Sequence, residues 1–403
     1  MKEKIIVMGG GIQGICCALA LSHLDVHITI IDKTREPLLR SGLRNEGKIH
    51  LGFVYANDDS FRTASLMLRS ALQFAPLMES FFQRKIDWEP LRSRKFNYLI
   101  LNETLLSTQK ILEHYELLQK EYQLINDSSL HYVGARPTCL WEEKDLTIEG
   151  LNRTAVSRCI PTEEVALDLV EFRKLLLQEI AKRKNISFLG GHHINEIKKT
   201  SYGYSVTGNN ALSKKWSLDC GLLINCLWEN RLLFDQQLGI ETSRKWVYRL
   251  KNRILGKAPS SIGALNSFTC VLGAFGDVVN YNNQLTYLSW YPACMSGWSS
   301  ELTTPHAWEN ACNGQIKLED NKAWVDTALK ELDHLFPGMA GFEVLQIDGG
   351  IIFTWGKTDI VDVQSELHNR YEIGVQQYDD YFSIDTGKFT TAPLFAHNLK
   401  LLL

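Results

Sequence analysis

A glycine-rich turn near the N-terminus constrains the fold of this 403-residue chain more than any other feature. Residues 9–14 read Gly-Gly-Gly-Ile-Gln-Gly and fit the pattern G-x-G-x-x-G. They follow an apolar run at residues 4–8 and open an apolar stretch with helical spacing that extends to His23. A second apolar run at residues 26–31 ends at Asp32. This order predicts a βαβ unit and therefore an α/β fold.

The same turn predicts a dinucleotide site. Backbone N–H groups at the start of a helix can hold a pyrophosphate, and side chains on the glycines would obstruct that approach. Asp32 can accept hydrogen bonds from both ribose hydroxyls and would repel a 2′-phosphate. The fingerprint favours dinucleotide binding over a plain tight turn, but it does not distinguish FAD from NAD.

The nearly balanced charge gives no electrostatic reason to expect nucleic acid or an anionic membrane as a partner. Forty-three basic and 46 acidic residues leave a formal charge of −3. No stretch approaches the roughly 20 apolar residues that a membrane-spanning helix needs. The nine cysteines form no CxxC pair, which favours buried reduced thiols over a metal site or disulfides. We therefore expect a cytoplasmic protein without a metal.

The rest of the chain alternates helical and extended segments. Residues 60–125 look mainly helical, and Thr162 is expected to begin a helix that runs to about residue 184. A β-rich aromatic segment at residues 246–291 precedes a helix at residues 321–336, and a final helix ends the chain. Short strands are predicted at residues 186–189, 192–197, 204–207 and 222–225.

We predict two interleaved domains, because the α/β pattern returns after each interruption. A Rossmann-like domain is assembled from residues 1–80, 151–235 and 345–403. Residues 81–150 and 236–344 form an inserted domain of mixed sheet and helices that covers the cofactor and holds the substrate.

Two further elements bear on the identity of the cofactor. Residues 41–52 read SGLRNEGKIHLG, and residues 385–393 read DTGKFTTAP. On these elements the chain resembles the D-amino-acid oxidase and glycerol-3-phosphate dehydrogenase superfamily of flavoproteins. Members carry an Ile-His-x-Gly element beside the flavin and a Gly-Lys-x-Thr-Thr element that cradles its ring. The resemblance is much weaker over residues 83–150 and 236–340, and it implies that the cofactor is FAD.

The motifs and the resemblance together give a set of expected FAD contacts. In the first part of the chain these are Gly9, Gly11, Ile12, Gln13, Gly14, Asp32, Lys33, Ser41, Arg44, Asn45, Gly47, Lys48, Ile49 and His50. Later in the chain they are Ile194, whose strand would contact adenine through its backbone, and Asn225, Cys226, Gly387, Lys388, Phe389 and Thr390.

Two ionisable residues in these elements are candidates for catalysis. Histidines at the place of His50 lie near the flavin in the family, so we expect His50 beside the ring without a covalent bond. The alternative is a histidine satisfied by backbone groups. Lys388 is expected near N1 and the C2 carbonyl, where a cation favours reduction, and Thr391 is expected to cap the final helix. The alternative is a surface lysine in a turn.

Arg249 is the third candidate. Strand alternation would place Arg249 and Lys251 on one face, where they either bind an anionic substrate or form a solvated surface. The chain also departs from the family at two places. Leu227 and Trp228 stand where members often have Ala-Gly. Amino-acid oxidases place a carboxylate-binding arginine where this chain has Ile352, so common D-amino acids and glycine are expected to be poor substrates.

These features predict an FAD-dependent oxidase or dehydrogenase. A hydride would pass to flavin N5 from a carbon that bears an amine or a hydroxyl, and oxygen or a quinone would reoxidise the flavin. Two alternatives stay open, a nucleotide-binding protein without turnover and an NAD-dependent dehydrogenase. The polar loop at residues 41–52 argues against the first, and the Gly-Lys-x-Thr-Thr element argues against the second.

Overall fold

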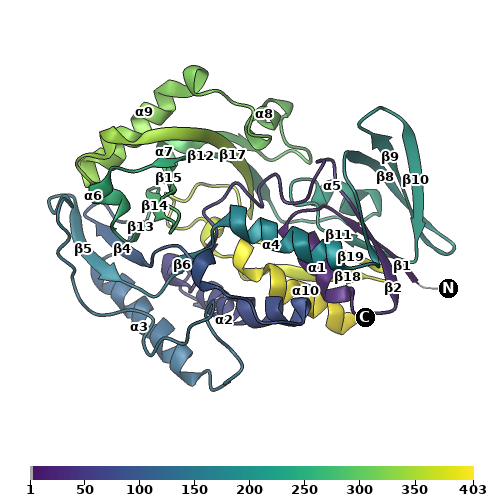
Figure 1. Cartoon of the computed structure of the whole chain (residues 1–403), viewed down its shortest axis with the longest axis horizontal. Coiled ribbons are helices and arrows are strands. Elements are labelled where there is room, and N and C mark those ends of the chain that lie inside the picture. The colour runs from purple at the N-terminus through teal and green to yellow at the C-terminus, as the bar shows by residue number, and fades with distance from the viewer. Residues whose placement is uncertain (1–2) are drawn as a thin grey trace.

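The computed structural model describes residues 3–403 and contains a six-stranded sheet built from distant parts of the chain (Figure 1). The strand order is β18-β19-β11-β1-β2-β7. Neighbouring strands are parallel except for the antiparallel pair β18 and β19. The bounds are β1 Glu3–Met8, β2 Val26–Ile31, β7 Ile186–Leu189, β11 Leu222–Asn225, β18 Gly374–Tyr378 and β19 Tyr381–Asp385.

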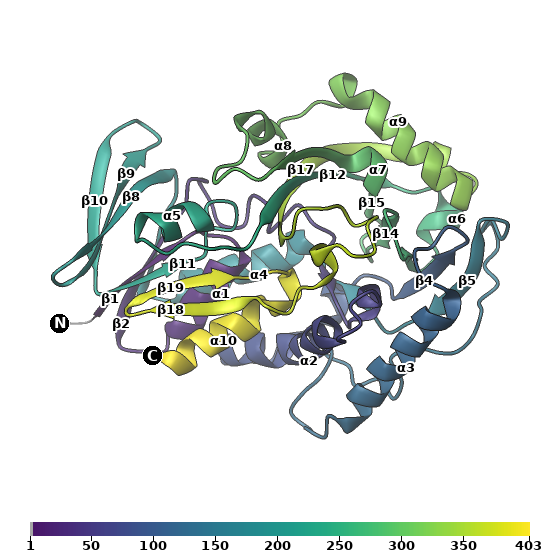
Figure 2. The ribbon, with the colours of Figure 1, turned by 180° about the vertical axis from the view of Figure 1, so that it is seen from behind.

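Helix α1 (Ile12–Leu21) is buried along its whole length. It contacts β1 and β2 and also packs against α10 (Ala392–Leu402) and α2 (Arg62–Phe82). A helix that is covered on several sides needs apolar residues around its circumference, and this segment supplies them. Figure 2 shows α10, in yellow, beside α1, so the end of the chain covers its beginning.

A second sheet of eight strands has the order β16-β12-β15-β14-β13-β4-β5, and β17 pairs with the whole length of β12. Helix α9 (Leu318–Leu335) packs on this sheet through a separate apolar cluster. The bounds are β4 Phe96–Leu101, β5 Val156–Pro161, β12 Trp246–Lys257, β13 Ser267–Val271, β14 Gly276–Asn280, β15 Thr286–Trp290, β16 Met295–Ser299 and β17 Glu343–Trp355.

Smaller elements complete the fold. One small sheet contains β8 His192–Thr200, β9 Gly203–Asn210 and β10 Lys215–Cys220. Another consists of β3 Lys48–Ile49 and β6 Val165–Ala166. The other α-helices are α3 Thr108–Leu124, α4 Leu169–Lys182, α5 Arg231–Gln237, α6 Ser260–Gly263, α7 Tyr291–Cys294 and α8 Glu309–Cys312. The 3₁₀ helices are η1 Phe53–Tyr55, η2 Glu89–Leu91, η3 His306–Trp308, η4 Met339–Gly341, η5 Glu366–His368 and η6 Phe389–Thr391.

The predicted α/β class is confirmed, as are the strands at residues 26–31, 186–189 and 222–225. The helical prediction for residues 60–125 is only partly right, because β4 lies between α2 and α3. All six residues of β4 are buried, since the strand pairs with β13 on one side and β5 on the other. The second sheet also contains β5 and most of β17, which fall inside the ranges predicted for the first domain. Eight of the nine cysteines are buried.

The prediction that Thr162 begins a helix is wrong. Its hydroxyl donates to the Phe96 carbonyl at 2.8 Å. The chain first forms β6, and α4 begins at Leu169, where the Asp168 carboxylate accepts hydrogen bonds from two backbone N–H groups. A carboxylate at this position both caps the helix and complements its dipole. Across residues 3–403, none of the helices has the length and apolar character that spanning a lipid bilayer requires.

Candidate active site

The glycine turn joins the end of β1 to the N-terminus of α1. Gly9 has a φ of +101°, which an L side chain rarely adopts. A Cβ on Gly14 would lie 1.9 Å from the Gly9 carbonyl oxygen, so the close contact between turn and helix requires glycine at position 14. A Cβ on Gly11 would meet no atom of the described residues within 4 Å. The space beside Gly11 is therefore open to a ligand at the helix N-terminus.

Asp32 follows β2 and lies beside this turn. Its two carboxylate oxygens accept hydrogen bonds from the backbone N–H groups of Gly10 at 2.6 Å and Thr34 at 2.7 Å. These bonds fix the carboxylate in the cavity wall. The oxygen bonded to Thr34 also accepts from the Thr34 hydroxyl at 2.7 Å, so the oxygen bonded to Gly10 is the one that can still accept a further hydrogen bond.

Lys33 lines the same cavity, but its ammonium group already has partners. Its Nζ lies 2.9 Å from Glu229 and 3.0 Å from Glu309. Arg40 pairs with the same two carboxylates. These four side chains form a neutral cluster, so Lys33 brings little unpaired charge to the cavity.

One cavity contacts most of the residues selected from the sequence. The predicted cofactor residues that line it are Gly9, Gly11, Ile12, Gln13, Asp32, Lys33, Ser41, Arg44, Asn45, Lys48, His50, Ile194, Cys226, Gly387, Lys388 and Phe389. The same cavity reaches Lys251, Tyr287, Ile352 and Arg370, which come from β12, β15, β17 and the segment before β18.

Five predicted residues lie behind the cavity wall. Thr390 Oγ1 accepts a hydrogen bond from the His50 backbone N at 2.9 Å. Asn225 Nδ2 donates to the Tyr381 hydroxyl at 2.7 Å. A Cβ on Gly47 would lie 2.2 Å from the Leu167 carbonyl oxygen. These residues support the wall without lining it, and the set is Gly14, Gly47, Ile49, Asn225 and Thr390.

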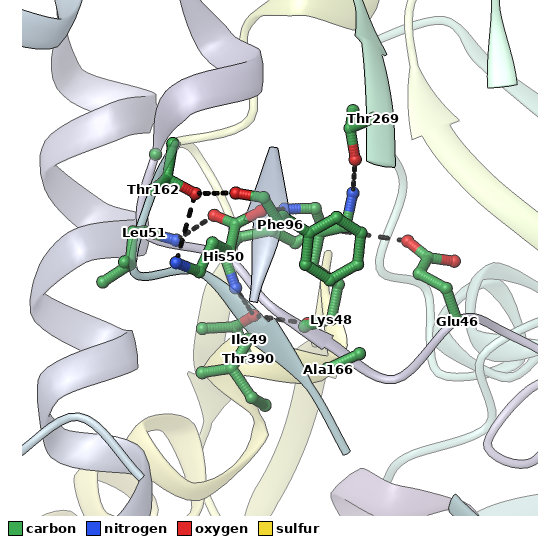
Figure 3. Close-up of polar contacts among 12 residues, drawn as sticks. Glu46, Lys48, Ile49, His50, Leu51, Phe96, Thr162, Ala166, Thr269 and Thr390 are labelled. Carbon is green, nitrogen blue, oxygen red and sulfur yellow. Dashed lines mark hydrogen bonds and ion pairs between the residues drawn. The ribbon is translucent and has the colours of Figure 1, made fainter. Parts of the chain in front are cut away.

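His50 lies between two carboxylates, and Figure 3 shows it with Glu46. Its Nε2 is 4.0 Å from Glu46, and its Nδ1 is 3.9 Å from Glu164. Burial, and then the charges of Lys388 and Lys48, lower the pKa of His50 well below its usual value. The imidazole is therefore neutral at neutral pH and can accept a proton.

Glu164 is fully buried beside this histidine. It accepts hydrogen bonds from the Leu51 backbone N at 2.7 Å and from the Tyr98 hydroxyl. Burial raises the pKa of Glu164. His50 Nδ1 makes no hydrogen bond to any residue from 3 to 403, and this carboxyl group is its neighbour on the buried side at 3.9 Å.

Lys48 points toward β13, as Figure 3 shows. Its Nζ donates to the Thr269 hydroxyl and to Asp277 Oδ1 at 2.8 Å. Lys251 Nζ lies 3.9 Å from the other oxygen of Asp277. Burial would raise the pKa of Asp277, but the two lysines outweigh burial and lower it to about 2. Asp277 is therefore shared by two neighbouring lysines.

Lys388 and Arg370 add two more cations to the cavity wall. Burial, and then the charge of Arg370, lowers the pKa of Lys388 to about 7. Burial and the charge of Arg249 lower the pKa of Arg370 to about 10. These cations disfavour one another's charged forms, whereas Glu46, in the same cavity wall, favours the charged form of Lys388.

Arg249 was predicted to be catalytic but does not line the cavity. It is only 2% exposed, and its terminal nitrogens donate to the Tyr291 hydroxyl at 2.8 Å and to Thr354 Oγ1 at 3.4 Å. A direct contact between Arg249 and substrate stays a prediction.

Comparison with known proteins decides which dinucleotide the chain binds. A family model described as FAD dependent oxidoreductase matches residues 4–254. This chain belongs to that family. Its cofactor is FAD, and it is an oxidase or a dehydrogenase. A search of curated proteins found no match.

Solved structures share the fold of this FAD-dependent oxidoreductase. Glycine oxidase from Geobacillus kaustophilus is 14% identical with a TM-score of 0.66, over 100% of this chain and 94% of that one. L-amino acid deaminase from Proteus vulgaris is 9% identical with a TM-score of 0.67, over 100% and 94%. L-alpha-glycerophosphate oxidase from Mycoplasma pneumoniae is 14% identical with a TM-score of 0.66, over 100% and 95%.

The cavity of this oxidoreductase fits FAD. The open space beside Gly11 faces the helix N-terminus, where a phosphate is stabilised. Arg44 lines the cavity, and its buried Nη1 has no hydrogen-bond partner among residues 3–403. A buried donor of this kind needs an acceptor, and an acceptor atom of a ligand bound in the cavity would satisfy it.

Sequence reasoning missed several cavity residues. Glu46 could have been found, because it stands inside the quoted element at residues 41–52. Arg370 carried no such signal, since it lies in a segment without a motif. Trp228, which stands where family members often have a small residue, donates a hydrogen bond from its Nε1 to the Ile351 carbonyl at 2.7 Å.

The predicted capping role of Thr391 is wrong. Its hydroxyl donates to the carbonyl oxygens of Thr386 and, at 2.7 Å, Lys388. The side chain therefore closes the turn that carries Lys388 and makes no capping bond to α10. Pro393 stands in the first turn of α10, as expected.

Proposed function

We propose that this oxidoreductase oxidises a C–N or C–O bond of a small substrate that carries an amine or a hydroxyl. The observation that supports this most is that one cavity joins the glycine turn to an ionisable cluster containing His50, Lys251 and Lys388. FAD bound there supplies a flavin ring whose N5 accepts a hydride. The protein's own residues must then hold the substrate and take up its proton.

The cavity residues suggest how the cofactor is held. The N-terminus of α1 and Arg44 bind the diphosphate, and Asp32 accepts hydrogen bonds from the ribose. Residues 192–194 of β8 line the same cavity beside Asp32 and contact the adenine. His50 and Lys388 lie at the flavin ring.

His50 is the proton acceptor in this proposal. A hydroxyl or an ammonium group must lose a proton when its carbon loses a hydride, so that a ketone or an imine can form. His50 is neutral, and its Nε2 is on the side of Glu46, a cavity residue. Glu164 acts as a positioning residue, because its carboxyl group is 3.9 Å from Nδ1 on the buried side and stabilises the imidazolium that forms.

Lys388 tunes the flavin in this proposal. A cation near N1 and the C2 carbonyl interacts more strongly with the reduced ring than with the oxidised ring. The electron acceptor that then reoxidises the flavin is oxygen or a quinone.

The decisive test combines absorbance with rapid mixing. The purified protein is yellow if it retains oxidised flavin, and anaerobic addition of amines, amino acids and hydroxy acids identifies compounds that bleach it. With a bleaching compound in hand, His50→Gln should slow bleaching by at least roughly a hundredfold while the oxidised spectrum persists.

His27→Gln is the matched control, because His27 lies on β2 and lines no part of the cavity. Bleaching of the His50→Gln protein at the wild-type rate would remove His50 from the proton-transfer step. A protein that binds FAD but is bleached by none of these compounds would contradict the proposed reaction.

A further inference from the structure

Strand β19 carries a row of polar side chains that ends beside the turn at residues 386–391. Residues alternate along a strand, so Tyr381, Ser383 and Asp385 lie on one face of the sheet. The apolar residues between them belong to the core formed with α1 and α10 on the other face. All five residues of β19 are buried. Figure 2 shows α5 beside this strand, and all three polar side chains make hydrogen bonds to that helix.

Helix α5 provides one carboxylate and one cation to this row. The Asp235 carboxylate accepts hydrogen bonds from the Tyr381 hydroxyl at 2.6 Å and the Ser383 hydroxyl at 2.8 Å. The Arg231 guanidinium donates to Asp235 at 3.4 Å and to Asp385 at 3.3 Å. Arg231, Asp235 and Asp385 are 3%, 3% and 4% exposed. Charges buried in this way need all their partners, so the cluster fixes the positions of its members.

The Asp385 carboxylate joins this cluster both to the turn at residues 386–391 and to the second sheet. Its Oδ1 accepts a hydrogen bond from the Gly387 backbone N at 3.2 Å. Its Oδ2 accepts from Trp355 Nε1 at 2.8 Å and from Arg231. Trp355 is the last residue of β17, which belongs to the second sheet. One carboxylate therefore links the turn to α5 and to both large sheets.

The backbone of the turn departs from regular secondary structure. Gly387 has a φ of +64°, and a Cβ there would lie 2.3 Å from a neighbouring side-chain carbon. The Lys388 backbone N donates to the Thr386 carbonyl at 2.6 Å, and the Thr391 hydroxyl donates to the carbonyl oxygens of both residues. Thr391 thus fixes the turn from within, Asp385 fixes it from outside, and Lys388 lines the cavity from it.

We propose that Asp385 is a positioning residue that holds Lys388 at its place in the cavity wall. It acts through the Gly387 backbone, and Trp355 and Arg231 keep its carboxylate in place. The effect of Lys388 on the flavin rests on the proposed function, whereas the hold on the turn does not. Asp385 does not line the cavity, so it acts on the flavin through Lys388. Coulomb energy falls with distance, so a shift of the ammonium group away from the ring weakens its effect on the reduced flavin.

The first test is a double-mutant cycle on the flavin midpoint potential of the FAD-loaded protein. Trp355→Phe removes one hydrogen bond to Asp385 and keeps an aromatic ring. Lys388→Met is introduced into wild type and into Trp355→Phe, and potentials are measured at pH 6, below the Lys388 pKa of about 7. We expect the effect of Lys388→Met to be at least roughly twofold smaller in the Trp355→Phe protein, because the freed turn holds the ammonium group less closely to the ring.

Tyr381→Phe is the matched control within the same cluster. It removes the hydrogen bonds of the Tyr381 hydroxyl with Asp235 and Asn225, and it leaves the contacts of Asp385 in place. Both Trp355→Phe and Tyr381→Phe should therefore be less stable than wild type in urea. In the Tyr381→Phe protein, however, the effect of Lys388→Met on the potential should equal that in wild type.

Asp385→Asn is the stronger variant. An amide has one oxygen, whereas the carboxylate of Asp385 accepts hydrogen bonds at both. Either Gly387 or Trp355 then faces an N–H group in place of its acceptor. We expect the effect of Lys388→Met on the potential to be smaller in Asp385→Asn than in Trp355→Phe, because the turn loses its hold more completely.

Hydrogen exchange of the backbone tests the hold on the turn without reference to the potential. Mass spectrometry of the FAD-loaded proteins follows the peptide that contains the Gly387 and Lys388 amides. Exchange of this peptide should be at least roughly tenfold faster in Trp355→Phe than in wild type, and it should be unchanged in Tyr381→Phe.

The two measurements separate failure of this proposal from failure of the proposed function. An effect of Lys388→Met that is present and equal in wild type, Trp355→Phe and Tyr381→Phe would overturn the positioning role of Asp385. An absence of any effect of Lys388→Met would contradict the tuning of the flavin by Lys388. In that case, faster exchange confined to Trp355→Phe would still support the hold on the turn, and equal exchange in the three proteins would overturn it.

Discussion

The two regions of the cavity are built in different ways. The nucleotide region is formed largely by backbone, through the glycine turn and Asp32, within about the first 32 residues. The catalytic region is formed by ionisable side chains from distant segments, among them His50, Lys251 and Arg370. A Cβ added to a glycine of the turn blocks the close contact between the backbone and its neighbour. Removing one charge from a cluster of several changes the electrostatic potential of the cavity only in part. Mutations in the two regions should therefore differ in kind as well as in size.

The largest effect is expected in the glycine turn. Gly14→Ala places a Cβ 1.9 Å from the Gly9 carbonyl oxygen and should destabilise the apo-protein by about 3 kcal/mol, because α1 must move away from the turn. Urea unfolding followed by circular dichroism measures this loss. An unchanged unfolding midpoint would show that the turn relaxes freely.

Gly11→Ala is the matched control within the same turn. Its Cβ meets no atom of residues 3–403 within 4 Å, and its φ of −73° suits alanine. The unfolding free energy should change by less than about 1 kcal/mol, while FAD affinity falls because the new methyl group occupies the space of the diphosphate. Equal losses of stability in both variants would contradict the assignment of Gly14 to packing within the turn and of Gly11 to ligand binding.

The next effect concerns Asp32. Asp32→Ala should weaken FAD binding by about 1.5 to 3 kcal/mol, the value of one or two charge-assisted hydrogen bonds. Quenching of flavin fluorescence on titration with the apo-protein measures this affinity. The exposed Asp219, on β10, offers Asp219→Ala as a control with the same change of charge. Full affinity in the Asp32 variant would show that the ribose binds elsewhere.

A smaller effect is expected in the catalytic region. Lys388→Met should lower the flavin midpoint potential by about 20 mV at pH 6, equivalent to about 1 kcal/mol for two electrons. The pKa of Lys388 is about 7, so its charge is present below this pH and lost above it. The difference from wild type should therefore shrink as the pH rises from 6 to 8.

Potentiometric titration at both pH values makes the measurement, with the exposed Lys357→Met as control. A difference that stays constant across this range would mean that Lys388 does not titrate there. No difference at either pH would leave α10, whose N-terminus follows η6, as the remaining candidate for tuning the ring.

An effect of about the same size as that of Lys388→Met is expected where the two regions are joined. Ser41 Oγ donates to the Ile351 carbonyl and accepts from the Ile351 N, each at 3.1 Å. Ser41→Ala should therefore cost about 0.5 to 1.5 kcal/mol of stability, measured by urea unfolding. The exposed Ser128 makes Ser128→Ala a suitable control. Equal stability of the two variants would show that this tie contributes nothing.

The difference between the regions also explains what could be predicted from the sequence. Gly9, Asp32 and the first βαβ unit were predictable, because the turn, helix and strand are adjacent in the chain and their spacing is set by backbone geometry. Glu164 and Arg370 were not, because their positions depend on how distant segments pack. The start of α4 was predicted at Thr162, but Asp168 caps the helix. The pairing of β6 with β3, two distant segments, prevents an earlier start.

Arg370, which lines the cavity, shows the same limit. The absence of arginine at Ile352 suggested that the cavity lacks a carboxylate partner. A cationic side chain can reach one cavity from several directions, and a linear sequence does not show which of the 43 Lys and Arg residues will do so. Only the fold shows that Arg370 faces the same space.

The position of β19 beside β11 has a consequence for synthesis of the protein. Residues 381–385 complete a parallel pairing with a strand made more than 150 residues earlier, and α10 then covers α1. Contacts between such distant segments form late, because a long loop must close first. Until the ribosome has synthesised residues 381–402, the emerging chain has neither the Gly387–Lys388 turn nor the helix that covers α1. Loading of FAD should therefore be an event that follows translation of these residues, and an unfinished chain should be a target for chaperones.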